Sequence, residues 1–172
     1  MEKKIALITG GSTGIGASVA EQLSEAGLLV VICDVNERLG INLAEKLSGH
    51  FIYCDVTDLS SVEKAAQTCE QQLGTPTFVH LNAGIMSVPT GAPFLAIEDL
   101  SVEQYKRIVG VNLDGVFHGL KTVLPKIGNQ GGAITITAST AGLGGGPADP
   151  MYTATKDAVI GMARAVAEKK KK

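Results

Sequence analysis

The sequence contains no tryptophan, and only 4% of its 172 residues are aromatic. It also has few side chains that bind metals or form disulfides. The cysteines and histidines are widely separated and form neither a C-x-x-C pair nor a cluster with metal-ligand spacing: Cys33, Cys54 and Cys69, with His50, His80 and His118. We therefore predict no metal site, and we expect the three thiols to be reduced, buried apolar side chains.

A strong charge of either sign is absent as well. The chain has 15 basic and 17 acidic residues, a net charge of -2, so no basic surface for nucleic acid is predicted. No apolar run approaches the ~18 residues that a membrane span needs. Met1–Lys4 leads directly into the strand-length run Ile5–Ile8, which is not a signal peptide. These observations predict a cytoplasmic protein without a membrane or nucleic-acid partner.

Short apolar runs alternate with segments of helical periodicity. The predicted strands are Ile5–Thr9, Leu28–Cys33, Phe51–Cys54, Phe78–Leu81 and Ala133–Thr137. The predicted helices are Gly14–Ala26, Asn36–Leu47, Ser60–Leu73, Ser101–Leu124 and Tyr152–Glu168, with Pro125 just past the end of the fourth. Two segments are expected to be loops, Ile85–Leu100 and Gly142–Asp149. Continuously apolar strands separated by helices predict an α/β fold, a three-layer, doubly wound parallel sheet.

The first predicted strand runs into a helix through the glycine-rich segment Thr9–Gly16, whose sequence is TGGSTGIG. Glycine allows the backbone N–H groups of such a turn to approach a pyrophosphate, and the helix N-terminus favours the negative charge. The spacing is G-x-x-x-G-x-G, without the G-K-[ST] of a P-loop. The predicted phosphate-binding residues are Gly10, Ser12, Thr13, Gly14, Ile15 and Gly16.

Acidic and amide side chains follow the next three strands. Asp34 follows the second strand, where a carboxylate can accept hydrogen bonds from ribose hydroxyls and repel a 2′-phosphate. This favours NAD over NADP, although Arg38 could reach a phosphate instead. Two further groups occupy equivalent strand ends and are either cofactor contacts or ordinary turn formers: Asp55 and Val56, and Asn82, Ala83 and Gly84.

Tyr152 and Lys156 are four residues apart in the last predicted helix, which places them on one face. A free phenol loses its proton only near pH ~10, but a nearby cation stabilises the phenolate and makes the group a usable acid/base at neutral pH. Ser139 lies just after the fifth strand, where its hydroxyl can hold a substrate oxygen. Taken alone, Tyr152 and Lys156 would be an ordinary surface pair. Their coincidence with the glycine segment, Asp34 and Ser139 favours a catalytic role.

These motifs together resemble the short-chain dehydrogenase/reductase family, in its short single-domain subgroup. The resemblance rests on T-G-x-x-x-G-I-G at Thr9–Gly16, D-V at Asp55–Val56, N-A-G at Asn82–Gly84, V-N-L around Asn112, Ser139, and Y-x-x-x-K at Tyr152–Lys156. It implies a Rossmann fold with strand order 3-2-1-4-5. It further implies that Tyr152 is the acid/base, that Lys156 assists it and holds the nicotinamide ribose, that Ser139 orients the substrate oxygen, and that Asn112 holds a water in a proton relay.

The chain departs from the family at its C-terminus. Family members continue with two further strands and a substrate lid, so we expect an incomplete NAD-binding domain over 1–168 and a lysine tail over 169–172. That tail could be a helix charge complement, a solubilising end or the product of a frameshift. The fifth strand would then be an exposed edge.

Two functions remain open. One is an NAD-dependent oxidoreductase that interconverts a secondary alcohol and a ketone. The other is a truncated dinucleotide-binding module without turnover. The resemblance also implies a homodimer or homotetramer.

Overall fold

The computed structural model describes residues 4–144 and 149–169, which fold around one parallel sheet. Its strands are β1 (Ile5–Thr9), β2 (Leu29–Asp34), β3 (His50–Tyr53), β4 (Phe78–Leu81) and β5 (Ala133–Ile136). They lie in the order β3-β2-β1-β4-β5, and every neighbouring pair is parallel. The predicted doubly wound sheet and its strand order are confirmed.

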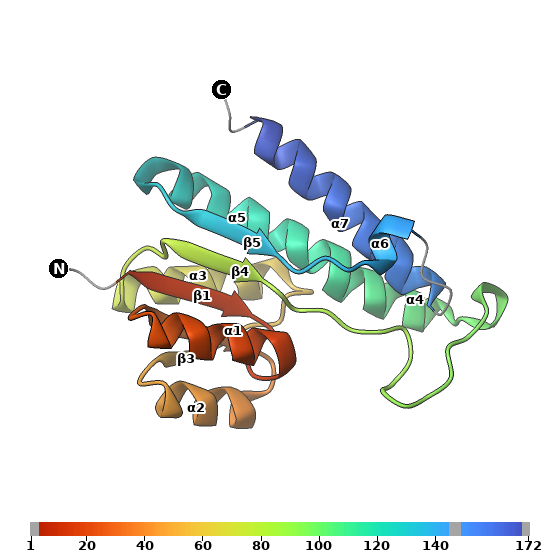
Figure 1. Ribbon diagram of the computed structural model, residues 1–172, viewed down its shortest axis with the longest axis horizontal. Coiled ribbons are helices and arrows are strands. Elements are labelled where there is room, and N and C mark those ends of the chain that lie inside the picture. The colour runs from red at the N-terminus through yellow and green to blue at the C-terminus, as the bar shows by residue number, and fades with distance from the viewer. Residues whose placement is uncertain (1–3, 145–148, 170–172) are drawn as a thin grey trace.

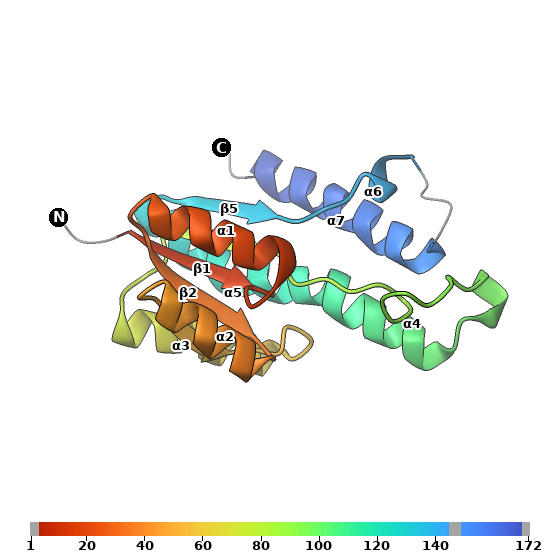
Figure 2. The ribbon, with the colours of Figure 1, turned by 60° about the horizontal axis from the view of Figure 1, so that its bottom comes forward.

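Helices cover the sheet on two sides (Figure 1). Helices α1 (Gly14–Glu25) and α2 (Glu37–Lys46) pack on one face, where Ile8 and Ile32 are fully buried. Helices α3 (Leu59–Gln72) and α5 (Gly115–Gln130) cover the other face, and Figure 2 shows the sheet between the two layers. Because successive side chains of a strand point to opposite faces, the apolar strands supply both interfaces.

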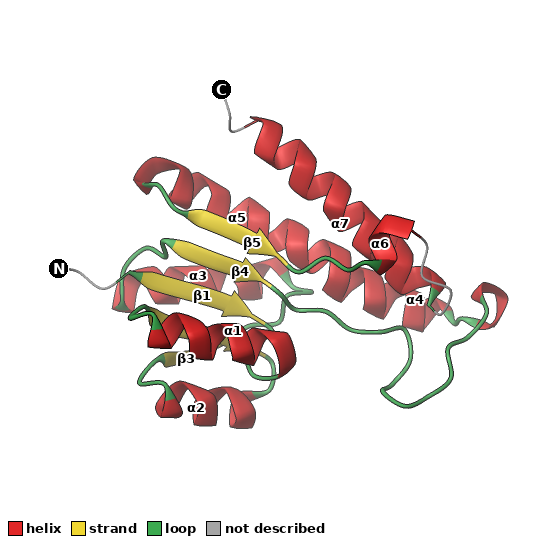
Figure 3. Ribbon diagram, viewed as in Figure 1, coloured by secondary structure: helices red, strands yellow, loops and turns green. Residues whose placement is uncertain are grey.

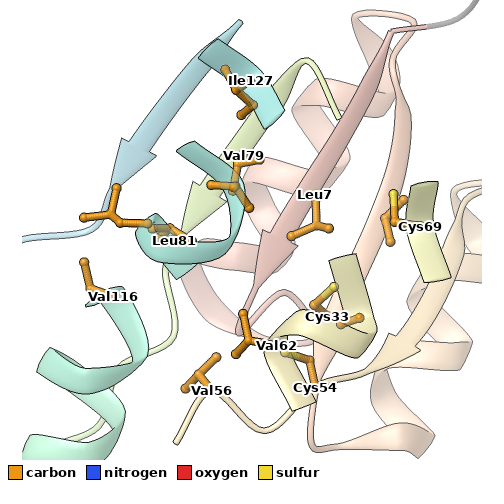
Figure 4. Close-up of a cluster of buried hydrophobic side chains, with 14 of the residues drawn as sticks. Leu7, Cys33, Cys54, Val56, Val62, Cys69, Val79, Leu81, Val116 and Ile127 are labelled. Atoms are coloured by element: carbon orange, nitrogen blue, oxygen red, sulfur yellow. The ribbon is translucent and has the colours of Figure 1, made fainter. Parts of the chain in front are cut away.

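The larger core cluster lies on the α3 and α5 face (Figure 4). Leu7, Val79 and Leu81 of the strands meet Val62 of α3 and Val116 of α5 there. The thiols of Cys33, Cys54 and Cys69 belong to the same cluster, and all three cysteines are free and buried. The predicted role of the cysteines as reduced core residues is therefore confirmed.

The predicted helix Ser101–Leu124 is a longer helical run with a change of pitch. It consists of α4 (Val102–Val109), a π-helical segment at Gly110–Asp114, and α5. At its start, Ser101 accepts a hydrogen bond from the Gln104 N–H, and the Gln104 side chain accepts one from the Ser101 N–H. This is the capping box that the sequence predicts.

The expectation that this helix ends before Pro125 is wrong, because Pro125 lies inside α5. Proline removes one backbone hydrogen bond from a helix interior. The next turn nevertheless carries Ile127, which is buried in the large core cluster. Burial of that side chain offsets the missing bond, and the helix ends at Gly131, whose φ is 76°.

The segments around the last helix complete the fold. The predicted loop Gly142–Asp149 begins instead as a short helix, α6 (Ala141–Gly144), and its residues 145–148 lie outside the described part. Helix α7 spans Pro150–Lys169, and residues 170–172 of the predicted lysine tail are also outside that part. Figure 3 shows the mostly irregular segment between β4 and α4 projecting from the body of the domain. Within the described residues, β5 pairs only with β4, so the expected free edge is present.

Candidate active site

A cleft of about 770 Å³ lies where the strands end, and most of the predicted site residues line it. The predicted site residues that line the cleft are Gly10, Thr13, Gly14, Ile15, Asp34, Asp55, Val56, Asn82, Ala83, Gly84, Tyr152 and Lys156. Ser12, Gly16, Asn112 and Ser139 are not among its lining residues. Carboxyl ends of parallel strands are the usual ligand site of doubly wound sheets.

The glycine segment forms one wall of the cleft. Gly10 has a φ of 61°, and a Cβ there would lie 2.7 Å from the Cα of Ala83. Gly14 has a φ of 54°, and no atom lies within 4 Å of the position that its Cβ would take. Thr13 precedes α1 as the N-cap residue without a side-chain capping bond. The open space in front of Gly14 and the uncapped N–H groups of α1 fit a bound phosphate group.

Asp34 contributes a fixed negative charge at the end of β2. One of its carboxylate oxygens accepts a hydrogen bond from the Ser12 N–H at 3.0 Å, and the other from the Asn36 N–H at 2.9 Å. Ser12 thus acts on the cleft indirectly, because its backbone holds the carboxylate in place. The remaining lone pairs of the carboxylate can accept hydrogen bonds from hydroxyl groups of a ligand.

Asn82 joins three parts of the site through its side-chain amide. Its Nδ2 donates to the Gly10 carbonyl at 3.0 Å, and its Oδ1 accepts a hydrogen bond from the Thr137 hydroxyl at 2.9 Å. The Asn82 amide thereby ties the segments that follow β1, β4 and β5 together. Asp55 binds locally, because its Oδ1 accepts hydrogen bonds from both the N–H and the hydroxyl of Thr57.

Lys156 and Tyr152 meet on one side of α7. Lys156 is only 2% exposed, and its Nζ donates a hydrogen bond to the Thr137 carbonyl at 2.7 Å. Burial lowers the pKa of the Lys156 ammonium from its ordinary value. The Nζ lies 5.7 Å from the centre of the Tyr152 ring. A buried cation beside a half-buried phenol is an arrangement suited to proton transfer.

Asn112 and Ser139 do not line the cleft. Asn112 is fully buried in the π-helical segment, where it accepts a hydrogen bond from the Ile85 N–H and donates to the Ile85 carbonyl and the Thr155 hydroxyl. The Ser139 hydroxyl accepts a hydrogen bond from the Ala141 N–H at 3.2 Å. A hydroxyl that accepts one hydrogen bond can still donate its own proton to another oxygen.

Sequence reasoning missed Ser87, Asp149 and Thr155. Asp149 precedes Pro150, and an aspartate followed by proline is a signal for a helix start, which places it at the N-terminus of α7. Ser87 and Thr155 carry no sequence signal of their own, because the side chains that bind them, Asp149 and Asn112, are 62 and 43 residues away in the chain.

The buried thiols and the histidines do not form a metal site in the described residues. Burial is the main cause that raises the pKa of the Cys54 thiol to about 12 and that of Cys69 to about 11, so both stay protonated. Of the helices in the described ranges, none is long and apolar enough to span a membrane.

The chain is similar to known proteins over almost its whole length. The short chain dehydrogenase family pattern matches residues 4–172. The chain is 38% identical to a borneol dehydrogenase of Lavandula x intermedia, named as mitochondrial, over 95% of this chain and 62% of the relative. It is 36% identical to the short-chain dehydrogenase reductase ATA1 of Arabidopsis thaliana, over 96% of this chain and 60% of the relative.

A solved structure of NAD+-bound xylitol dehydrogenase superposes with a TM-score of 0.90 at 27% identity, covering 97% of this chain and 65% of that one. The chain therefore spans about three fifths of the length of these two curated relatives.

Proposed function

The chain belongs to the short-chain dehydrogenase family, and we propose that it is an NAD-dependent oxidoreductase that interconverts a secondary alcohol and a ketone. The observation that carries this proposal is the convergence of two groups on one cleft. The glycine segment and Asp34 supply a dinucleotide site, and Tyr152 with Lys156 supplies a proton-transfer pair. Either group alone could be purely structural, as a tight turn or a surface pair, but their meeting in one cleft is specific to a dinucleotide-dependent reaction.

The residues of the cleft fit a nicotinamide dinucleotide. Gly14 and the N-terminus of α1 would hold the pyrophosphate, and Asp34 would accept hydrogen bonds from the adenosine ribose. The fixed carboxylate of Asp34 supports NAD rather than NADP, because a 2′-phosphate would lie beside a negative charge. When bound, the cofactor accepts or donates the hydride of the reaction.

The chain's own residues would handle the substrate oxygen and its proton. Tyr152 takes the hydroxyl proton of the alcohol, or returns it to the ketone oxygen in the reverse direction. Lys156 stabilises the phenolate form from its buried position, and Ser139 donates a hydrogen bond to the substrate oxygen. Asn112 positions the segment at Ile85 and holds the proposed relay water.

Side chains after β4 would select the substrate. Met86, Val88 and Pro89 line the cleft together with Val111 of the π-helical segment. These are apolar surfaces, and they suit the carbon skeleton of a small alcohol or ketone rather than a polar chain.

A second candidate function is a dinucleotide-binding module without turnover. The observation that favours it is that two of the predicted catalytic residues, Asn112 and Ser139, do not line the cleft. The two candidates share the cofactor site and differ only in chemistry, so one experiment separates them.

That experiment measures NADH and NADPH binding by fluorescence, followed by NAD reduction with a panel of secondary alcohols. We expect tighter binding of NADH, measurable turnover, and a loss of at least about 100-fold in kcat for Tyr152→Phe at unchanged NADH affinity. The control is Tyr105→Phe, since Tyr105 is 47% exposed and does not line the cleft. Binding without any turnover would favour the second candidate.

The proposal extends to assembly and location. We infer a homodimer or homotetramer, with the protein in the cytoplasm. Sedimentation of the purified protein and imaging of a tagged full chain test these two points.

A further inference from the structure

Asp149 and Ser87 form a buried contact between the segment after β4 and the start of α7. One carboxylate oxygen of Asp149 accepts two hydrogen bonds from Ser87, from its N–H at 2.9 Å and from its hydroxyl at 2.7 Å. Ser87 is 1% exposed and Asp149 is 3% exposed. Polar and charged side chains are usually buried this deeply only when they are hydrogen-bonded, and both of these side chains are.

The other oxygen of Asp149 serves a different element. It accepts a hydrogen bond from the Tyr152 N–H at 3.0 Å, which caps the first turn of α7. That turn carries Tyr152, and Lys156 follows one turn later on the same helix. The carboxylate thus acts directly on the backbone that holds the proposed acid/base.

Ser87 lies within the rim of the cleft. Its chain neighbours Met86 and Val88 both line the cleft, and its carbonyl accepts a hydrogen bond from Arg107 of α4 at 3.3 Å. All of the polar groups of Ser87 are therefore bonded, to Asp149 on one side and to α4 on the other.

The negative charge of Asp149 has no salt-bridge partner in the described part of the chain. Its neighbours are three hydrogen-bond donors and the N-terminus of α7, which carries a partial positive charge. A carboxylate in this place accepts from two elements at once, whereas a side chain with one acceptor can serve only one of them.

We propose that Asp149 is a positioning residue that sets the substrate rim at Met86 and Val88 in register with Tyr152. This inference rests on the proposed oxidoreductase function, and it assigns the two carboxylate oxygens separate effects. The Asp149 oxygen that binds the Tyr152 N–H fixes the acid/base and so keeps kcat high. The Asp149 oxygen that binds Ser87 fixes the rim and so keeps KM for the alcohol low.

Three variants separate these effects. Ser87→Ala removes the hydroxyl bond alone. Asp149→Ser keeps a short side chain that can cap α7 but cannot reach Ser87 as well. Asp149→Ala removes both contacts. Asp157→Ser is the matched control, because Asp157 lies on the same helix, is exposed, and does not line the cleft.

For Ser87→Ala and Asp149→Ser we expect KM for the alcohol to rise about tenfold, with kcat changed less than about twofold. For Asp149→Ala we expect the same rise in KM and, in addition, a fall of about 10- to 100-fold in kcat from the misplaced phenol. NADH affinity should stay unchanged in all four variants. The assignment would be overturned if Asp149→Ser and Asp149→Ala had the same kcat and the same KM. It would also be overturned if Ser87→Ala left KM unchanged.

Hydrogen exchange gives a readout that does not depend on turnover. The amides of residues 86–88 should exchange faster in Asp149→Ser and Asp149→Ala, but that of Tyr152 should do so only in Asp149→Ala. If the wild type binds NADH without turnover, the oxidoreductase proposal fails, and exchange at these two segments still decides whether Asp149 couples them. Unchanged exchange at 86–88 in both variants contradicts the coupling.

Discussion

The Lys156 ammonium donates a hydrogen bond to the Thr137 backbone carbonyl, 2.7 Å away. Thr137 directly follows β5, and its hydroxyl in turn binds Asn82 after β4. Helix α7 is therefore joined to the ends of two strands through a single buried cation. The contact holds the proposed proton-transfer pair against the sheet, and it places a titratable group where burial lowers its pKa.

The first prediction concerns how stability changes with pH below 10.5, the ordinary pKa of a lysine. Because the folded-state pKa of Lys156 is lowered, the native protein loses this proton at a lower pH than the unfolded chain does. The unfolded state then holds more protons, and stability rises with pH in that window. The free energy of unfolding of the wild type should therefore rise relative to that of Lys156→Met, as measured by urea unfolding at a series of pH values.

The buried thiols act in the opposite direction, because burial raises the pKa values of Cys33, Cys54 and Cys69. They are common to both proteins and cancel in the difference. Lys121→Met is the control, since Lys121 is exposed on α5. Parallel stability curves for the wild type and Lys156→Met would rule out this titration.

A second prediction compares two glycines that both have a positive φ, one at the start of α1 and one just after its end. Gly14 and Gly27 have φ values of 54° and 87°, and neither has an atom within 4 Å of its virtual Cβ. Alanine at either position should cost about 1 kcal/mol from backbone strain. Only Gly14→Ala should also weaken NADH binding, by about tenfold or more, because its Cβ enters the proposed phosphate site. Equal NADH affinities of the two variants in a fluorescence titration would place the phosphate elsewhere.

The third prediction tests the choice between NAD and NADP. Asp34→Asn keeps the shape of the side chain and removes its charge, so NADH affinity should fall about tenfold while NADPH affinity stays level or rises. Glu37→Gln is the matched control, because Glu37 is an exposed carboxylate in the first turn of α2. An unchanged ratio of the two affinities in Asp34→Asn would show that this carboxylate does not select the cofactor.

The fourth prediction compares two buried threonines that differ in whether their hydroxyl groups make hydrogen bonds. Among the described residues, the Thr122 hydroxyl on α5 has no hydrogen-bond partner, whereas the Thr155 hydroxyl donates to the Tyr152 carbonyl and accepts from Asn112. Thr122→Val should stabilise the protein by about 1 kcal/mol, and Thr155→Val should destabilise it by about 1–3 kcal/mol. Chemical denaturation measures both, and a loss of stability in Thr122→Val would mean that its hydroxyl does have a partner.

Much of the fold could be predicted because it depends on local pattern. The apolar strand at Ile5–Thr9 and the glycine turn before α1 need no knowledge of distant residues. Asn36 caps α2 as expected, with its Oδ1 accepting a hydrogen bond from the Leu39 N–H. The cleft follows from the fold, because parallel strands bring their carboxyl ends, and the residues after them, to one edge.

The remaining features depend on tertiary contacts. Pro125 is a helix-breaking signal, yet burial of Ile127 in the next turn carries α5 past it. The contact of Ser87 with Asp149 joins segments 62 residues apart and leaves no trace in the periodicity of either. Ser139 lies just after a strand end as predicted, but it does not line the cleft, and its hydroxyl accepts a hydrogen bond from the Ala141 N–H.

The number of residues in the π-helical segment Gly110–Asp114 sets how α5 is rotated relative to α4. Each residue of an α-helix turns the chain by about 100°. A π-helical turn holds more residues than an α-helical turn, so a deletion of one residue within 110–114 would remove the extra residue and leave α4 and α5 close to their present register. A deletion near the start of α5 would instead rotate the rest of that helix by this angle and carry Leu120 and Val123 away from the sheet. A protein engineer could therefore shorten the chain by one residue in this segment, away from the buried Asn112, with less repacking than a deletion inside α5 would require.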